Sequence, residues 1–349
     1  MKILIGSDGY TAHYYIRLGL AQALTIAGHE VIMWQMDKKP TNDAFDEFEP
    51  DLFISQTFNF KSSILNAIKE RPNLKVICKA GDWGVMGNKI DKEKFNMLFA
   101  SNEEIDKVLK LKQECGKPDY VYIHYPSEYV EQSHGYWIKN GVPAYSQLNA
   151  ADILTYTNGQ FNNNFKSDLT FIGGYWPYKA QVLDPYLLPL CNKYQVKIFG
   201  NGIWPVHQYC GMLPNNLVKH ALASATICPS LAEPHAHEYG FEIAERPFKL
   251  SSNKCFIISD WIDGLVKLYP EDEVVYAKSP EEFHDKVKYY LEYPDERLPF
   301  IKKSFKNTIE NHTYFDRTAE IFSRLNLQKE AENMRYVKQY ALKKLGIEV

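Results

Sequence analysis

Short apolar runs alternate along the first half of the chain with segments of helical periodicity. The helical segments are Tyr14–Ala27, Ser62–Glu70 and Glu103–Leu111, and Gly28 closes the first of them. The strand-like runs are Lys2–Ile5, Glu30–Trp34, Asp51–Ser55, Lys75–Cys78, Leu98–Ser101 and Tyr120–His124. Strands that alternate with helices predict a parallel, doubly wound sheet.

The periodicity fails between His134 and Lys166, where the run Asn162–Asn164 is most typical of a linker. It then resumes, with strands expected at Leu169–Ile172, Val196–Phe199, Thr226–Cys228, Cys255–Ile258 and Val274–Tyr276. We therefore predict an α/β protein with two Rossmann-like domains that face a central cleft. The expected domains are residues 1–160 and 161–328, and a C-terminal helix, 329–349, is free to pack back on the first domain.

The composition of the chain excludes few classes of function. The chain has 349 residues, 45% of them hydrophobic and 24% charged, and a net charge of −3. It therefore lacks the overall basic character typical of proteins that bind nucleic acid, so a nucleic-acid partner is disfavoured. No apolar run reaches the roughly 18 residues of a membrane span, and the six cysteines show no C-x-x-C spacing. These features favour a cytoplasmic location with reduced thiols.

Two glycine-rich turns follow predicted strands of the second half. Gly173-Gly174 precedes a helix that carries Lys179 in its first turn, a combination that attracts an anion such as a pyrophosphate. Gly200-Asn201-Gly202 is followed by Trp204 and by a second turn with an apolar wall at Leu213. The backbone of these loops could hydrogen-bond a nucleobase. Turns without any ligand remain the alternative for both segments.

The stretch from Phe241 to Asp260 combines charge with a buried strand. Pro247 fits only the first turn of a helix, which places the positive end of that helix close to Arg246. The other charged positions of this helix are Glu242, Glu245 and Lys249. The segment suits an anionic ligand, and a solvated surface helix is the alternative.

Four residues are candidates for acid–base chemistry. Asp82 ends a predicted strand, where a carboxylate is well placed to deprotonate an acceptor hydroxyl. A turn or helix-cap aspartate is the alternative. His13 follows the first glycine turn. Glu238 ends the segment Glu233–Glu238, and Glu242 follows that segment. That segment contains two histidines, but no second ligand cluster accompanies it, so no metal site is expected.

These pieces, in this order, resemble glycosyltransferases of the GT-B fold, in the group 1 branch that includes the spore-maturation CgeB-like proteins. The resemblance covers roughly residues 168–325 well and the first half only in outline. It is carried by the segments Asp168–Gly174, Val196–Gly202 with Trp204, Gly211–Pro214, Arg246–Lys249, Phe256–Asp260, Pro280–Glu282, Tyr289–Leu291 and Asn311–Tyr314. The family motif R-x-F-E becomes Arg246-Pro247-Phe248-Lys249, so that lysine replaces its glutamate.

The resemblance implies transfer of a sugar from a nucleotide-sugar, with UDP as the expected nucleotide, to a hydroxyl of a glycan or another acceptor. It implies no tightly bound cofactor, no metal, and a mostly retaining reaction. Asp82, Glu238, Glu242 and His13 would then be the catalytic candidates. The donor would contact Gly173, Gly174, Tyr175, Trp176, Lys179, Gly200, Asn201, Gly202, Trp204, Leu213, Glu245, Arg246 and Lys249.

Two alternatives stay open. The chain also resembles, more loosely, the phage DNA β-glucosyltransferases, which would make a hydroxymethylated pyrimidine base the acceptor. Because Lys249 departs from the family motif, a UDP-sugar epimerase or a non-catalytic binding module of the same fold is the other alternative.

Overall fold

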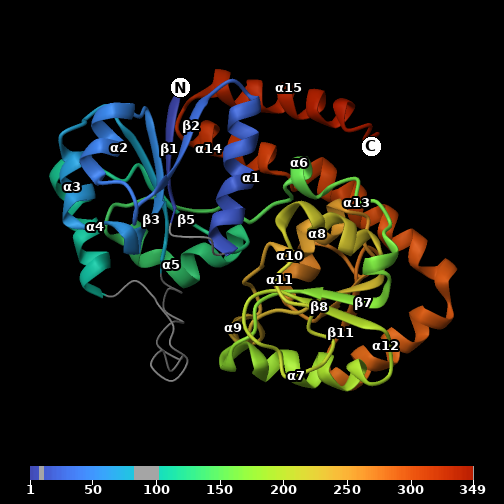
Figure 1. The fold of residues 1–349 in the computed structure, drawn as a ribbon. Helices are drawn as coiled ribbons and strands as arrows, with labels where there is room; N and C mark the ends of the chain where they lie inside the picture. Colours follow the sequence, from blue (N-terminus) through green and yellow to red (C-terminus); the bar gives the residue numbers. More distant parts are fainter. Residues whose placement is uncertain (8–11, 82–101, 349) are drawn as a thin grey trace. The chain divides into compact units, whose positions relative to one another are not determined.

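A computed structural model describes residues 1–7, 12–81 and 102–348 of the chain. It contains two compact units, each with its own parallel sheet and surrounding helices (Figure 1). The first unit consists of Met1–Leu148 and Tyr314–Lys344, and the second of Asn149–Thr313 and Leu345–Val349. The predicted α/β class with two Rossmann-like domains is therefore confirmed.

Six of the described strands build the sheet of the first unit, in the order β2-β1-β3-β4-β5-β6. Each strand is parallel to its neighbours, and the inner strands are buried on both faces, as their continuous apolar runs predict. The strands are β1 (Lys2–Ser7), β2 (Glu30–Gln35), β3 (Leu52–Gln56), β4 (Lys75–Lys79), β5 (Tyr120–Ile123) and β6 (Ala144–Ser146). The helices along this part of the chain are α1 (Ala12–Ile26), α2 (Thr41–Phe48), α3 (Ser62–Lys69), α4 (Asn102–Cys115) and α5 (Val130–Lys139).

The second unit repeats this plan with a parallel sheet in the order β11-β10-β9-β7-β8. Its strands are β7 (Ser167–Ile172), β8 (Val196–Phe199), β9 (Ala225–Ser230), β10 (Ile257–Asp260) and β11 (Val275–Ala277). Its helices are α6 (Ile153–Tyr156), α7 (Pro177–Cys191), α8 (Asn215–Ala223), α9 (Pro234–Tyr239), α10 (Arg246–Ser252), α11 (Asp263–Leu268), α12 (Pro280–Glu292) and α13 (Leu298–Asn311). Because all strands are parallel, the loops after their carboxyl ends gather at one edge of the sheet, where ligands bind in such folds.

The last two helices, α14 (Tyr314–Arg324) and α15 (Gln328–Lys344), belong to the first unit (Figure 1). Helix α14 packs on α1, and the Arg317 Nε–H donates to the Leu148 carbonyl across 3.0 Å. The Asn333 amide of α15 donates to the Ala27 carbonyl across 2.9 Å. The units thus divide between residues 148 and 149 rather than near 160, and α14 as well as α15 returns to the first unit.

The segment for which the sequence predicts irregular structure contains the end of α5, all of β6 and the one-turn helix α6. Helix α5 carries Gly135 and has a non-helical backbone at His134, which disturbs its periodicity. Strand β6 has only three residues, at the edge of the sheet. The expected strand Leu98–Ser101 and the catalytic candidate Asp82 lie outside the described residues.

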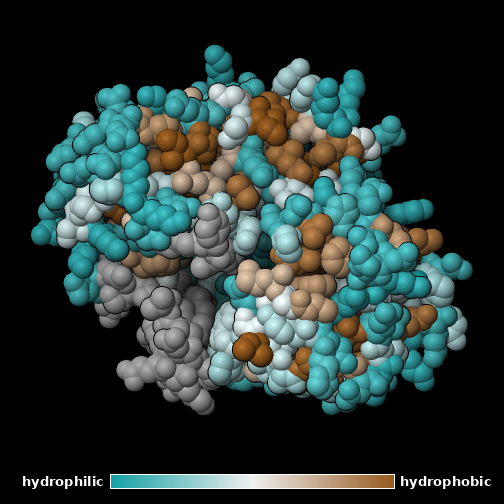
Figure 2. Space-filling model, in the orientation of Figure 1, coloured by the Kyte–Doolittle hydropathy of each residue, from teal (hydrophilic) through white to brown (hydrophobic). Residues whose placement is uncertain are grey.

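Polar residues cover much of the face seen in Figure 2, with small apolar groups between them. Within the described parts of the chain, we find no helix that is both long enough and apolar enough to span a bilayer.

Candidate functional site

The two glycine turns of the second unit interlock through their backbones. The Gly173 N–H donates to the Phe199 carbonyl at 2.9 Å, and the Tyr175 N–H donates to the Asn201 carbonyl at 2.8 Å. A Cβ on Gly200, whose φ is +142°, would lie 2.1 Å from the Gly173 oxygen. A Cβ on Gly202, whose φ is +84°, would lie 2.2 Å from the Tyr175 oxygen. Glycine is therefore required at both positions for the loops after β7 and β8 to form one surface.

Arg246 lies directly beside the first glycine turn. Its guanidinium donates to the Leu231 carbonyl at 2.5 Å and, at 3.4 Å, to the Ile172 carbonyl. It also stands 4.5 Å from the centre of the Phe171 ring. A Cβ on Gly173 would come within 2.8 Å of the Arg246 Nη2 atom, so only glycine leaves the guanidinium this close to the loop. The site thus has a fixed positive charge under a glycine turn, which suits a diphosphate.

The environment of Arg246 combines burial with acidic neighbours. Burial lowers the pKa of Arg246, while Asp260, Glu233 and Glu245 act in the opposite direction. A guanidinium keeps its proton throughout the physiological range. Arg246 is therefore a permanent cation, and the neighbouring carboxylates stabilise its charge.

Lys179 provides a second cation at the same edge, in the first turn of α7. Its ammonium nitrogen lies 2.7 Å from a Glu233 carboxylate oxygen and 4.2 Å from the centre of the Trp176 ring. Trp176 is 36% exposed, so its ring is accessible next to the glycine turn. The structure therefore brings together Gly173, Gly174, Trp176, Lys179 and Arg246.

Trp204 and Tyr175 pack against each other next to the glycine turns. Trp204 is only 2% exposed, and its ring packs 4.6 Å from Tyr175 and 5.5 Å from Phe171 between ring centres. The Tyr175 hydroxyl donates to Asp184 at 2.9 Å, and burial, with Asp184, raises the pKa of Tyr175 to about 12. Trp204 thus belongs to the hydrophobic core, whereas Asn201 is exposed and Leu213 is half-buried.

Lys249 is held in an ion pair on α10. Its ammonium nitrogen lies 2.9 Å from Glu245, one helical turn earlier, and 4.3 Å from the centre of the Tyr156 ring. Burial lowers the pKa of Lys249, but Glu245, Tyr156 and Asp152 outweigh burial, so that the pKa is raised overall. Lys249 therefore stays protonated, and its charge is matched locally by Glu245.

The segment around α9 contains two histidines, each paired with a carboxylate. The buried His235 ring has its Nε2 against the Glu242 carboxylate and its Nδ1 3.0 Å from the Tyr178 hydroxyl. His237 Nε2 lies 2.7 Å from Asp260 Oδ2. Glu242 is thus the partner of a histidine, while Glu238 is exposed on the same helix.

Asp260 is the buried carboxylate near the site that the sequence analysis did not single out as a candidate. It ends β10 and is fully buried, and its Oδ2 also accepts the Ala232 N–H at 2.8 Å. The signal was its place two residues after the apolar run that ends at Ile258. Its partners come from distant parts of the sequence, which spacing alone does not reveal.

In the first unit, His13 lies among other basic groups. Burial lowers the pKa of His13 well below its ordinary value, and the nearby charges of Lys79, Arg17 and His124 lower it further. The folded state therefore holds His13 neutral. A neutral imidazole can accept a proton, as a general base requires.

Acidification is expected to destabilise the protein through His13. The unfolded chain takes up a proton below about pH 6.5, whereas the folded chain resists it, so stability is complete above that pH and is lost as the pH falls below it. The loss is at most about 1.4 kcal/mol per pH unit for one histidine. His29, whose pKa is also lowered by burial, contributes in the same direction.

Urea unfolding at pH 7.5 and 5.5 should show a smaller effect of pH on the free energy of unfolding in His13→Gln than in the wild type. The exposed His207→Gln is the control, and equal pH effects in all three proteins would contradict this assignment.

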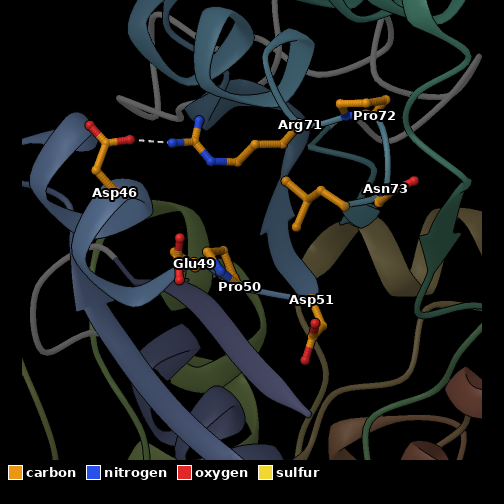
Figure 3. Close-up of a pocket in the computed structure, with 8 residues that line it drawn as sticks. Asp46, Glu49, Pro50, Asp51, Arg71, Pro72 and Asn73 are labelled. Atoms are coloured by element: carbon orange, nitrogen blue, oxygen red, sulfur yellow. Dashed lines mark hydrogen bonds and ion pairs between the residues drawn. The ribbon is translucent and has the colours of Figure 1, made fainter.

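A cavity of about 460 Å³ lies elsewhere on the first unit (Figure 3). It sits at the amino ends of β3 and β4, and its Arg71 pairs with Asp46. The lining residues are Asp46, Glu49, Pro50, Asp51, Arg71, Pro72, Asn73 and Leu74. This end of the sheet is opposite to the edge where ligands bind in parallel sheets, so the cavity is not the candidate site.

Across residues 1–7, 12–81 and 102–348, no three His, Cys, Asp or Glu side chains gather closely enough to hold a metal ion. Two side chains, Arg246 and Lys179, place positive charge at the glycine turns of the second unit.

Comparisons with known proteins agree with this geometry. Residues 182–323 match the family described as glycosyl transferase-like. A search of curated proteins finds no significant match.

Solved structures match almost the whole chain at low sequence identity. Sucrose-phosphate synthase from Thermosynechococcus elongatus has a TM-score of 0.65 at 11% identity, covering 95% of this chain and 100% of the other. An α-glucosyltransferase in complex with UDP-glucose and DNA containing an abasic site has a TM-score of 0.65 at 11% identity, covering 93% and 98%. T4 phage BGT in complex with its UDP-glucose substrate has a TM-score of 0.55 at 14% identity, covering 97% and 99%. The fold is therefore GT-B, and assignment to the CgeB-like branch stays a prediction.

Proposed function

We propose that the chain, which has the GT-B fold, is a glycosyltransferase that transfers a sugar from a UDP-sugar to a hydroxyl group of a glycan or small-molecule acceptor. The observation that carries this proposal is the Arg246 guanidinium beside the interlocked glycine turns. Two structural neighbours are bound to UDP-glucose, which supports the choice of nucleotide.

The chemistry of the proposed reaction follows from the charge that develops. The bond between the anomeric carbon and the diphosphate oxygen breaks, and UDP leaves as an anion. Arg246, Lys179 and the N–H groups at the start of α7 would stabilise this anion, in the way that fixed positive groups stabilise developing charge in other active sites. Because these cations belong to the protein, we propose that the reaction needs no bound metal.

Residues of the site have separate proposed roles. Gly200, Asn201, Gly202 and Leu213 would contact the nucleotide base and ribose, and Glu245 would bind ribose hydroxyls in place of the family glutamate that Lys249 replaces. Asp82, His13, Glu238 and Glu242 remain the candidates for proton transfer. The His237–Asp260 pair is added to them, because a buried carboxylate that orients a more exposed imidazole is a common acid–base arrangement.

A nucleotide screen tests the donor. Thermal unfolding is measured with UDP, GDP, ADP and TDP, and UDP is expected to stabilise the protein most, by about 2.7 kcal/mol at 100 times its dissociation constant. If none of the four nucleoside diphosphates raises the melting temperature, the proposed function is wrong.

Turnover of labelled UDP-sugars then separates the remaining alternatives. A glycoside product supports transfer, an epimeric sugar nucleotide would indicate an epimerase, and binding without turnover would indicate a binding module. NMR of the glycoside gives the anomeric configuration, for which we expect retention. Transfer to hydroxymethylated DNA is the second candidate, favoured by the neighbour bound to DNA and opposed by the net charge of −3.

A further inference from the structure

A row of polar side chains crosses the carboxyl edge of the sheet in the first unit. The strand register aligns Gln56 with Lys79, and Lys79 with Tyr122, on the neighbouring strands β3, β4 and β5. Residues paired in this way point to the same face of a sheet. Gln56 and Tyr122 are buried, whereas Lys79 is partly exposed, so Lys79 is the member of the row that reaches the ligand-binding edge.

Helix α1 and the end of β5 bring further basic groups to this row. The Arg17 guanidinium, in a side chain that is only 7% exposed, donates to the Gly6 carbonyl at the end of β1. Burial raises the pKa of Tyr122 to about 12, and the positive charge of Arg17 acts in the opposite direction. The His124 ring lies 5.8 Å from the Tyr122 ring between centres, and its Nδ1 is 2.7 Å from the Gln147 carbonyl oxygen. We call His13, Arg17, Lys79 and His124 the basic cluster.

The members of the basic cluster act on one another electrostatically. Lys79, Arg17 and His124 all disfavour a proton on His13, in addition to the effect of burial. His13 is therefore neutral, and the positive charge of the cluster comes from Arg17 and Lys79, which attract an anion more strongly in a partly buried place than they would in water. The cluster thus combines fixed geometry with a charge that a compact anion would complement.

A buried hydroxyl group lies at the same edge. Ser7 ends β1, level with Gln56 of β3, and its side chain is fully buried. Among the described residues, its Oγ atom has no hydrogen-bond partner. A buried hydroxyl normally has one, which points to a ligand or water oxygen at this edge.

We propose that the basic cluster binds a phosphate or carboxylate group of the acceptor, so that the preferred acceptor is a negatively charged small molecule. The proposal rests on the proposed function, because it names the class of acceptor for the same transfer. A cluster with buried members such as Arg17 suits one compact anionic group rather than the extended backbone of duplex DNA.

Anion binding is the direct test, with inorganic phosphate and acetate as probes in separate titrations. The two probes distinguish a phosphate site from a carboxylate site. Calorimetry should detect binding of at least one probe to the wild type, and Lys79→Gln should weaken it about tenfold, the effect of losing one charged contact. Lys75→Gln is the matched control, because Lys75 lies at the opposite end of the same strand. NMR of the His13 ring should show its pKa rising when the probe binds. No binding to the wild type, or equal weakening in both variants, would refute the proposal.

Acceptor preference is the functional test. Glucose is compared with glucose 6-phosphate and with glucuronate, and kcat/KM should be at least about tenfold higher for one charged acceptor. Lys79→Gln should remove this preference by raising KM for the charged acceptor only. A preference for glucose, or a gel shift of duplex DNA that depends on Lys79, would overturn the proposal.

Binding of UDP, measured on the same samples, separates a failure of the proposed acceptor class from a failure of the proposed function. If UDP binds normally to all variants while the anions do not bind, only the acceptor class is wrong. If UDP itself fails to bind, the proposed function is wrong as well.

Discussion

Arg246→Ala is expected to lower kcat/KM for sugar transfer about a hundredfold, which corresponds to about 3 kcal/mol of lost transition-state stabilisation. The reason is the position of the guanidinium, which is fixed by the Leu231 and Ile172 carbonyls beside Gly173. Since the charge on the leaving diphosphate grows as the bond breaks, the loss should appear mainly in kcat. Initial rates with the UDP-sugar identified by the nucleotide screen measure the effect.

Two further variants of arginine make this result interpretable. Arg246→Lys keeps the charge but cannot reproduce the planar contacts of the guanidinium, so an intermediate loss is expected. Arg335→Ala, an exposed position on α15, should have no effect. Circular dichroism and melting curves must first show that Arg246→Ala is folded, because its removal also leaves two carbonyls without their donor. A folded Arg246→Ala protein with normal kcat would rule out this role.

Gly200→Ala is expected to destabilise the second unit by about 3 kcal/mol or more, through backbone strain and atomic overlap together. The new Cβ would lie 2.1 Å from the Gly173 oxygen, and backbone atoms cannot yield as a flexible side chain can. The loops after β7 and β8 would have to separate, so UDP binding should fall as well. A melting temperature lower by roughly 6–12 °C is the expected observation.

Gly211→Ala is the matched control for this substitution. Gly211 also has a positive φ, +81°, but a Cβ there meets no atom within 4 Å. The control should therefore lose only about 1–2 kcal/mol, the cost of the left-handed backbone itself. If the two variants were equally stable, the close approach of the two turns would not matter for the fold.

Most of the fold was predictable because it depends on local pattern. Continuous apolar runs such as Cys255–Ile258 favour buried strands, and glycine turns after such runs mark the edge where a ligand binds. The prediction failed where local signals are weak. Strand β6 is short and lies at the sheet edge, and α5 has an internal glycine and a kink.

The candidate site was predictable only in part, for a different reason. Arg246 and Gly173 are recognisable from their places at a helix start and at a strand end. The His237–Asp260 contact depends on how α9 and β10 lie in three dimensions, and no sequence spacing reveals it. Trp204 shows the opposite error, because its place beside a glycine turn predicts a ligand contact, whereas its side chain is buried in the core.

The return of α14 and α15 to the first unit has a consequence for synthesis on the ribosome. The chain enters the second unit at Asn149 and leaves it at Thr313, so nearly all of that unit has been made before Tyr314 is added. The first unit, although its chain begins at Met1, must wait for the last two helices. Until then the side of α1 that α14 covers stays open to solvent and to other nascent chains. We therefore expect the second unit to complete its folding before the first, although the first unit begins earlier in the chain.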